Sequence, residues 1–95
     1  MKLLKIVKSD KRGKKMMAVF STNDGRTKTI HFGQASADDY TLTRNTEQRV
    51  RYLSRHRNNE NWSKPDSPGA LARWVLWNLP TKEASIADYK RRFNL

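Results

Sequence analysis

The segment from Ser67 to Pro80 constrains the fold more than any other, because it is apolar on nearly all sides. Ser67 suits the N-cap position and Pro68 the first helical position, while Pro80 disfavours helical backbone at the residue before it. Between these ends, Arg73 is the one charged residue. A helix that is apolar all round is a buried helix, and this one is too short to span a bilayer. The sequence therefore predicts a Trp-rich central helix on which the other elements pack.

Three short apolar runs precede that helix, at residues 2–8, 15–21 and 27–32. The first connector ends in Gly13, and the second contains Asn23-Asp24-Gly25, which is a strong hairpin signal. Tight connectors between consecutive strands give an antiparallel meander. The middle strand has no cleanly polar face, so we expect it to be the central strand.

The rest of the chain is predicted to be mainly helical, after a loop or single turn at residues 33–40. Asn45 and Gln48 resemble a capping box, so we expect a helix from there to about residue 57. With Leu53 as the inward direction, the helical wheel places three further residues inside: Thr46, Val50 and His56. It places Tyr52 on the flank and three residues outside: Gln48, Arg51 and Arg55.

A last helix is expected from Ser85, which has Asp88 in capping-box spacing. Its inward residues would be Ile86, Tyr89 and Phe93. The predicted fold class is α+β within a single domain of residues 1–95. A three-stranded antiparallel β-meander over residues 1–33 would be followed by about three helices over residues 34–95, the Trp-rich one buried.

Net charge is the unusual feature of the composition. Twenty Lys and Arg residues oppose nine Asp and Glu residues, which leaves a formal charge of +11 on 95 residues. Self-repulsion of this size opposes folding and is relieved when a polyanion binds. Nucleic acid is the first candidate partner, and an anionic lipid surface is the second.

Two groups of cations are candidate phosphate contacts. The first hairpin loop and its flanks carry five of them: Lys8, Lys11, Arg12, Lys14 and Lys15. The outward face of the first long helix carries Arg51 and Arg55, with Arg44 added if that helix starts early. For both groups the alternative is an ordinary solvated surface. Lys90, Arg91 and Arg92 lie in the last turns of the chain, where cations are favoured by the helix dipole alone.

Signals for catalysis or metal binding are weak. Cysteine is absent, and His31 and His56 lack a third ligand at any zinc-like spacing. Asp38 and Asp39 form the one adjacent acidic pair, which leaves a divalent-metal nuclease as a minor alternative. We therefore predict no enzyme activity, no catalytic residues, no metal and no cofactor. We also expect no signal peptide and no membrane span, and the absence of cysteine fits an intracellular, reducing compartment.

Several short motifs over residues 29–87 carry a resemblance to a known family. They are His31-Phe-Gly, Asp39-Tyr-Thr, Arg49, Arg51-Tyr, Arg55-His, Glu60-Asn-Trp62, Arg73-Trp, Leu76-Trp-Asn, Pro80-Thr and Ser85-Ile. In this combination the chain resembles a family of small basic proteins of uncharacterised function that large DNA viruses of eukaryotes encode. That family usually has a bulky aromatic residue after Gly69, where this chain has Ala70. The resemblance implies a virus-encoded protein that could be carried in the particle, and it supplies no catalytic residues.

The leading hypothesis is a non-enzymatic, largely sequence-independent nucleic-acid-binding protein that contacts a packaged viral genome. The alternative is a structural or adaptor component of a viral capsid or other assembly, whose basic surface docks on acidic partners. The charge balance alone favours neither DNA nor RNA.

Overall fold

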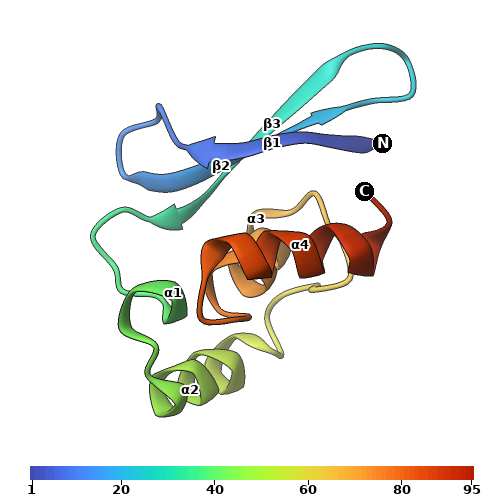
Figure 1. The fold of residues 1–95 in the computed structure, drawn as a ribbon. Helices are drawn as coiled ribbons and strands as arrows, with labels where there is room; N and C mark the ends of the chain where they lie inside the picture. Colours follow the sequence, from blue (N-terminus) through green and yellow to red (C-terminus); the bar gives the residue numbers. More distant parts are fainter.

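The computed structural model describes residues 1–95 and shows an α+β protein, as predicted. A three-stranded antiparallel sheet lies on one side of the molecule, and all the helices lie on its other side (Figure 1). The elements, in chain order, are β1 (Lys2–Lys8), β2 (Lys14–Ser21), β3 (Thr27–Gln34), α1 (Tyr40–Thr43), α2 (Thr46–His56), α3 (Pro68–Leu71), the π-helix η1 (Ala72–Leu76) and α4 (Lys82–Phe93).

The sheet has the order β1-β2-β3, so the strand that is apolar on both faces is central, as expected. Gly13 and Gly25 turn the two connectors with φ angles of +85° and +83°, a region that glycine enters without steric cost. The register of β1 against β2 shifts between Leu3 and Lys5, which marks an irregularity in this edge strand.

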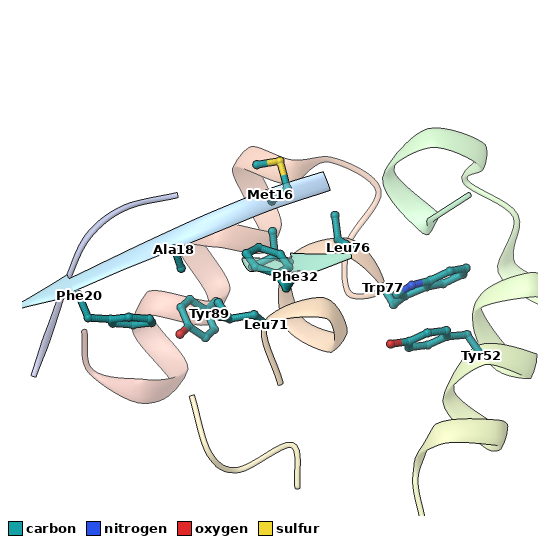
Figure 2. Close-up of a cluster of buried hydrophobic side chains, with 10 residues drawn as sticks. Met16, Ala18, Phe20, Phe32, Tyr52, Leu71, Leu76, Trp77 and Tyr89 are labelled. Carbon is teal, nitrogen blue, oxygen red and sulfur yellow. The ribbon is translucent and has the colours of Figure 1, made fainter. Parts of the chain in front are cut away.

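The core lies between the sheet and the helices (Figure 2). Strands β2 and β3 contribute Met16, Ala18, Phe20 and Phe32. We call residues 68–78, which comprise α3, η1 and the two residues after them, the central helical segment. This segment and α4 pack against the strands with Leu71, Val75, Leu76, Trp77 and Tyr89. The burial predicted for the Trp-rich helix is therefore confirmed, because four of its residues belong to this cluster.

The central helical segment differs from the regular helix that was expected. After the single turn of α3 the backbone widens into η1, in which the Trp77 amide donates to the Ala72 carbonyl at 3.1 Å. The carbonyls freed beyond this turn are used by arginines. Arg49 Nε donates to the Trp77 and Asn78 oxygens at 3.0 and 3.1 Å, and Arg73 Nη1 donates to the Trp77 oxygen at 3.2 Å. These hydrogen bonds provide donors for the carbonyl groups at the C-terminal end of the helix, which have no partner within the helix itself.

Helix α4 begins earlier than predicted. Thr81 is the N-cap, and its hydroxyl accepts from the Ala84 amide at 3.2 Å. Ser85, the predicted cap, is buried one turn inside the helix and accepts from the Leu79 amide at 3.0 Å. The predicted inward face is confirmed, since Tyr89 is fully buried and donates to the Pro65 carbonyl at 2.6 Å.

Helix α2 begins as predicted, with the Asn45 side chain accepting from the Gln48 amide at 3.0 Å. Its inward direction was predicted correctly in part: Leu53 packs against the core and His56 stacks on Tyr52, but Val50 does not face inward. Tyr52 is 9% exposed and faces the core, whereas Val50 is 57% exposed. Thr46 is exposed as well, so the helix is rotated towards its aromatic flank.

No helix in the structure is both long enough and apolar enough to cross a bilayer.

Candidate functional site

A cleft of about 550 Å³ separates one end of the sheet from α2. The sheet and the loop after it line one wall with Lys15, Gly33, Gln34, Ala37 and Asp38. Helix α2 lines the other wall with Gln48, Arg51, Tyr52, Arg55 and His56. Ala72, Leu76 and Trp77 of the central helical segment complete the cleft.

Gly33 allows the sheet wall to approach the central segment closely. It has a φ of +79°, and a Cβ atom at this position would lie 2.8 Å from Leu76 Cδ1 and 3.1 Å from Lys15 Cβ. A side chain here would therefore meet both backbone strain and a steric clash. Gly33, Lys15 and Leu76 all line the cleft, so this close contact between β3 and η1 lies within its lining.

The sheet wall also contains an ion pair between Lys15 and Asp39. Lys15 Nζ lies 2.6 Å from Asp39 Oδ2 and donates to the Ala37 carbonyl at 2.5 Å. The Asp39 side chain is 1% exposed and caps α1 by accepting from the Thr41 amide at 2.9 Å. The charge of Lys15 is therefore matched inside the protein, and the ion pair leaves it poorly placed for the phosphate contact that the sequence suggested.

The same ion pair bears on the minor nuclease hypothesis. Of the adjacent acidic residues, Asp39 is committed to Lys15 and the α1 cap, while Asp38 is exposed and lines the cleft. No group of three or more His, Cys, Asp or Glu side chains is arranged to hold a metal ion. The structure therefore gives the nuclease hypothesis no support.

The α2 wall rests on a stack of three rings. Tyr52 lies parallel to Trp77 (Figure 2). Their ring centroids are 4.3 Å apart and the interplanar angle is 5°. His56 stacks on Tyr52 at the same centroid distance. Burial, with a smaller contribution from the Glu60 carboxylate, raises the pKa of Tyr52 to about 12. The phenol is therefore neutral at physiological pH.

Arg51 and Arg55 lie on the part of α2 that faces the cleft. Together with Gln48, Tyr52 and His56 they follow the spacing of one helical stripe. Both arginines are exposed, and neither forms an ion pair. The face predicted to point outward thus points into a cleft, and the charges of its two arginines are not neutralised by ion pairs within the protein.

The β1–β2 loop lies on the same side of the molecule as the segment that joins β3 to α1 (Figure 1). Its base is tied to the wall, because the Ala35 amide donates to the Gly13 carbonyl at 3.0 Å. Four predicted contacts on the loop and its flanks are exposed and form no ion pair: Lys8, Lys11, Arg12 and Lys14. The base of the loop therefore lies beside the sheet wall of the cleft, and the α2 arginines lie on the opposite wall.

Arg44 is the predicted contact that the structure places elsewhere. It is the C-cap of α1, in the left-handed conformation with a φ of 53°, and so lies outside the α2 stripe. It lines a separate shallow hollow with Pro80 and Lys82. A contact by Arg44 would therefore belong to a different part of the surface.

Sequence reasoning missed the amides of Gln34 and Gln48 in the cleft and the role of Arg49. Arg49 lies over the Tyr40 ring, with Cζ 5.6 Å from the centroid, and its Nε bonds hold α2 to the central segment. The spacing of Arg49 relative to Tyr52 and His56 was the available signal, because residues three and seven apart share a helix face.

The motif residues near the end of α2 form a connected network. His56 Nδ1 lies 3.3 Å from Glu60 Oε1, and Trp62 Nε1 donates to Glu60 Oε2 at 3.3 Å. Trp74 Nε1 donates to the Trp62 carbonyl at 2.9 Å. These bonds join the end of α2 and the following loop to the central segment, so the motif has a structural explanation.

The arginines near the C-terminus are engaged within the fold. Arg92 lies over the Trp74 ring, with Cζ 3.9 Å from the ring centroid, and its Nη2 pairs with Asp88 Oδ2 at 3.3 Å. Asp88 also receives hydrogen bonds from Asn78 and Arg91 at 2.7 and 3.2 Å. The bond from Asn78, together with Arg92, lowers the pKa of Asp88. These contacts favour the interpretation of this cluster as part of the fold.

Comparison with known proteins places the chain in a family. Residues 4–56 match the profile of a family of unknown function, DUF5754, and this segment includes most of β1, the other two strands and α2. The chain belongs to that family. It is also 34% identical over 82 residues to an uncharacterized protein of Acanthamoeba polyphaga mimivirus, covering 78% of this chain and 80% of that protein. No solved structure matches the chain. The resemblance to proteins of large DNA viruses is thereby supported, and both walls of the cleft lie within the matched segment.

Proposed function

We propose that this DUF5754 protein binds nucleic acid through its phosphates, without strong sequence preference and without catalysing a reaction. One observation carries the proposal: cations free of ion pairs gather on the β1–β2 loop, whose base is bonded to the sheet wall of the cleft, and on the α2 wall of that cleft. The β1–β2 loop supplies Lys8, Lys11, Arg12 and Lys14, and α2 supplies Arg51 and Arg55. Unpaired surface cations of this density attract a polyanion and release its counterions on binding.

The biological setting of the proposal follows from the mimivirus relative. A basic protein of a large DNA virus would meet viral DNA in the infected cell and in the virion, and we propose contact with the packaged genome. The absence of cysteine suits a reducing compartment. The competing function is a structural adaptor that docks the same cations on an acidic viral protein.

Salt dependence tests the proposal directly. The affinity for a labelled DNA duplex should fall steeply with salt, with a log–log slope of about −0.9 for each phosphate neutralised. Replacing Lys8, Lys11, Arg12 and Lys14 with Ser should flatten this slope by up to about 3 to 4 units.

A control variant removes three cations from other parts of the surface: Arg26, Lys64 and Lys90. It should change the slope by no more than about 1 unit. Absence of binding to duplex and to single strands at about 0.15 M salt would refute the proposal. Binding to an acidic viral protein under the same conditions would favour the adaptor.

A further inference from the structure

We infer that the cleft holds an unpaired nucleotide of a single strand, while the β1–β2 loop contacts phosphates of any strand. This inference rests on the proposed function and names the ligand of its central site. The cleft volume of about 550 Å³ lies within the range of small-ligand sites. A space of that size admits part of one strand, whereas a double helix remains outside it.

The chemistry of the two walls matches the parts of a nucleotide. Arg51 and Arg55 are one helical turn apart at the rim and present planar donor groups suited to phosphate oxygens. Between the walls a base can contact a small apolar surface, formed by Ala72 and by the exposed parts of the largely buried Leu76 and Trp77. Single-strand sites in general combine a cationic rim with such surfaces.

Two amides are placed to contact the polar edge of a base. The side-chain amide of Gln34, on the sheet wall, forms no hydrogen bond with the protein, so its donor and its acceptor are both free, while the backbone carbonyl accepts from the Ala37 amide. Gln48 on the α2 wall uses its oxygen to accept from the Thr43 hydroxyl at 2.7 Å, which leaves its amide hydrogens for a ligand. An amide can pair with any of the bases, in agreement with weak sequence preference.

Electrostatics sets a further condition on the occupant. Asp38 is the one acidic side chain that lines the cleft, since Asp39 lies buried behind it in the ion pair with Lys15. A phosphate at the rim is repelled by Asp38 and attracted by the two arginines. Removing the Asp38 charge should therefore strengthen binding of the anionic ligand that we infer.

The test compares three probes at about 0.15 M salt: an oligothymidylate of about 15 nucleotides, a duplex of equal length, and heparin. The protein should bind the oligothymidylate more tightly than the duplex. The double variant R51Q/R55Q should lose about tenfold or more in affinity for the single strand and less than about threefold for the duplex. D38N should gain about twofold to threefold for the single strand.

The matched control is K11S/R12S, which also removes two exposed cations. It should weaken single strand and duplex by similar factors. Oligothymidylate should also quench the intrinsic tryptophan fluorescence, and heparin should not, because heparin carries charge without bases. The melting temperature of every variant should stay within about 3 °C of that of the original protein, since the altered side chains are exposed.

Each outcome has one meaning. Equal affinity for single strand and duplex, with both lowered equally by R51Q/R55Q, would overturn the cleft inference and leave the proposed function standing. Quenching by heparin as strong as by oligothymidylate would also overturn it. Failure to bind either nucleic acid would refute the proposed function itself.

Discussion

The sheet core and the attachment of α2 are held by different kinds of contact. Under the sheet, fully buried apolar side chains such as Phe20, Phe32 and Leu71 interlock across β2, β3 and the central segment. Helix α2 is instead held by a ring stack through Tyr52, by Arg49 bonds to two carbonyls, and by the contact between His56 and Glu60. The cleft lies where these two regions meet, so one wall is part of the core and the other depends on a few side chains.

The largest test of this difference is the removal of the ring that holds α2. Tyr52→Ala should lower the free energy of unfolding by about 3 to 4 kcal/mol, the usual cost of deleting a buried aromatic side chain. Amide exchange should show protection lost first in α2 and retained in β2. Val50→Ala, on the exposed side of the same helix, is the control and should stay within about 0.5 kcal/mol. Equal loss of protection in α2 and β2 would contradict the division into two regions.

A second test acts on the core side of the cleft. Gly33→Ala should cost about 2 to 3 kcal/mol, because a Cβ meets Leu76 at 2.8 Å in addition to the strain of a positive φ. Gly25→Ala is a matched control, since its φ of +83° is similar and no atom lies within 4 Å of the added Cβ. It should cost about 1 kcal/mol. Chemical denaturation measures both, and equal costs would show that the contact with Leu76 has no effect on stability.

A third test addresses the polar tether of α2. Arg49→Met keeps most of the side-chain length and removes the bonds to the Trp77 and Asn78 carbonyls, so we expect a loss of about 1 to 2 kcal/mol. Arg51→Met, two residues away, removes a cation without a protein partner and should leave the free energy of unfolding unchanged. Similar losses for both variants would show that the carbonyl bonds do not hold the helix.

The smallest effect at neutral pH comes from the Tyr52 hydroxyl. Burial raises the pKa of this phenol from 10 to about 12, so the folded state favours the neutral phenol. The contribution of this group to the free energy of unfolding is fully present below pH 10 and is lost as pH rises through 12. In that interval the original protein should lose up to about 1.4 kcal/mol per pH unit because of this group. Tyr52→Phe should be neutral at pH 7 and should remove this loss, as alkaline unfolding curves can measure. If Tyr52→Phe and the original protein lost stability equally between pH 10 and pH 12, the assigned burial of the hydroxyl would be contradicted.

The parts of the fold set by local chemistry could be predicted from the sequence. The turn residues Gly13 and Gly25 identified the two connectors, and Asn45 identified the start of α2. The rotation of α2 was missed because Leu53 was taken as the inward direction, although a tyrosine on the flank buries more area than a valine. The carbonyls that follow the π-helix accept from Arg49, which is 28 residues from the nearer acceptor, Trp77, so no local pattern reports this contact.

The candidate site was predictable in its residue types and not in its geometry. The loop cations and the pair Arg51 and Arg55 were visible as charge, and the structure shows which remain free. The neutralisation of Lys15 was not visible, because its partner Asp39 is 24 residues away and was considered only as a metal ligand. The cleft requires β3 and η1 to approach at Gly33, and no short-range pattern reports such a contact.

The lysines of the irregular edge strand have a consequence for assembly. Strand β1 carries three lysines along its length: Lys2, Lys5 and Lys8. Its register against β2 shifts between Leu3 and Lys5. An incoming strand from another molecule would have to align its backbone along this disturbed edge while bringing like charges together. These lysines, of which Lys8 is also a proposed polyanion contact, therefore protect the β1 edge against edge-to-edge fibre growth at high protein concentration.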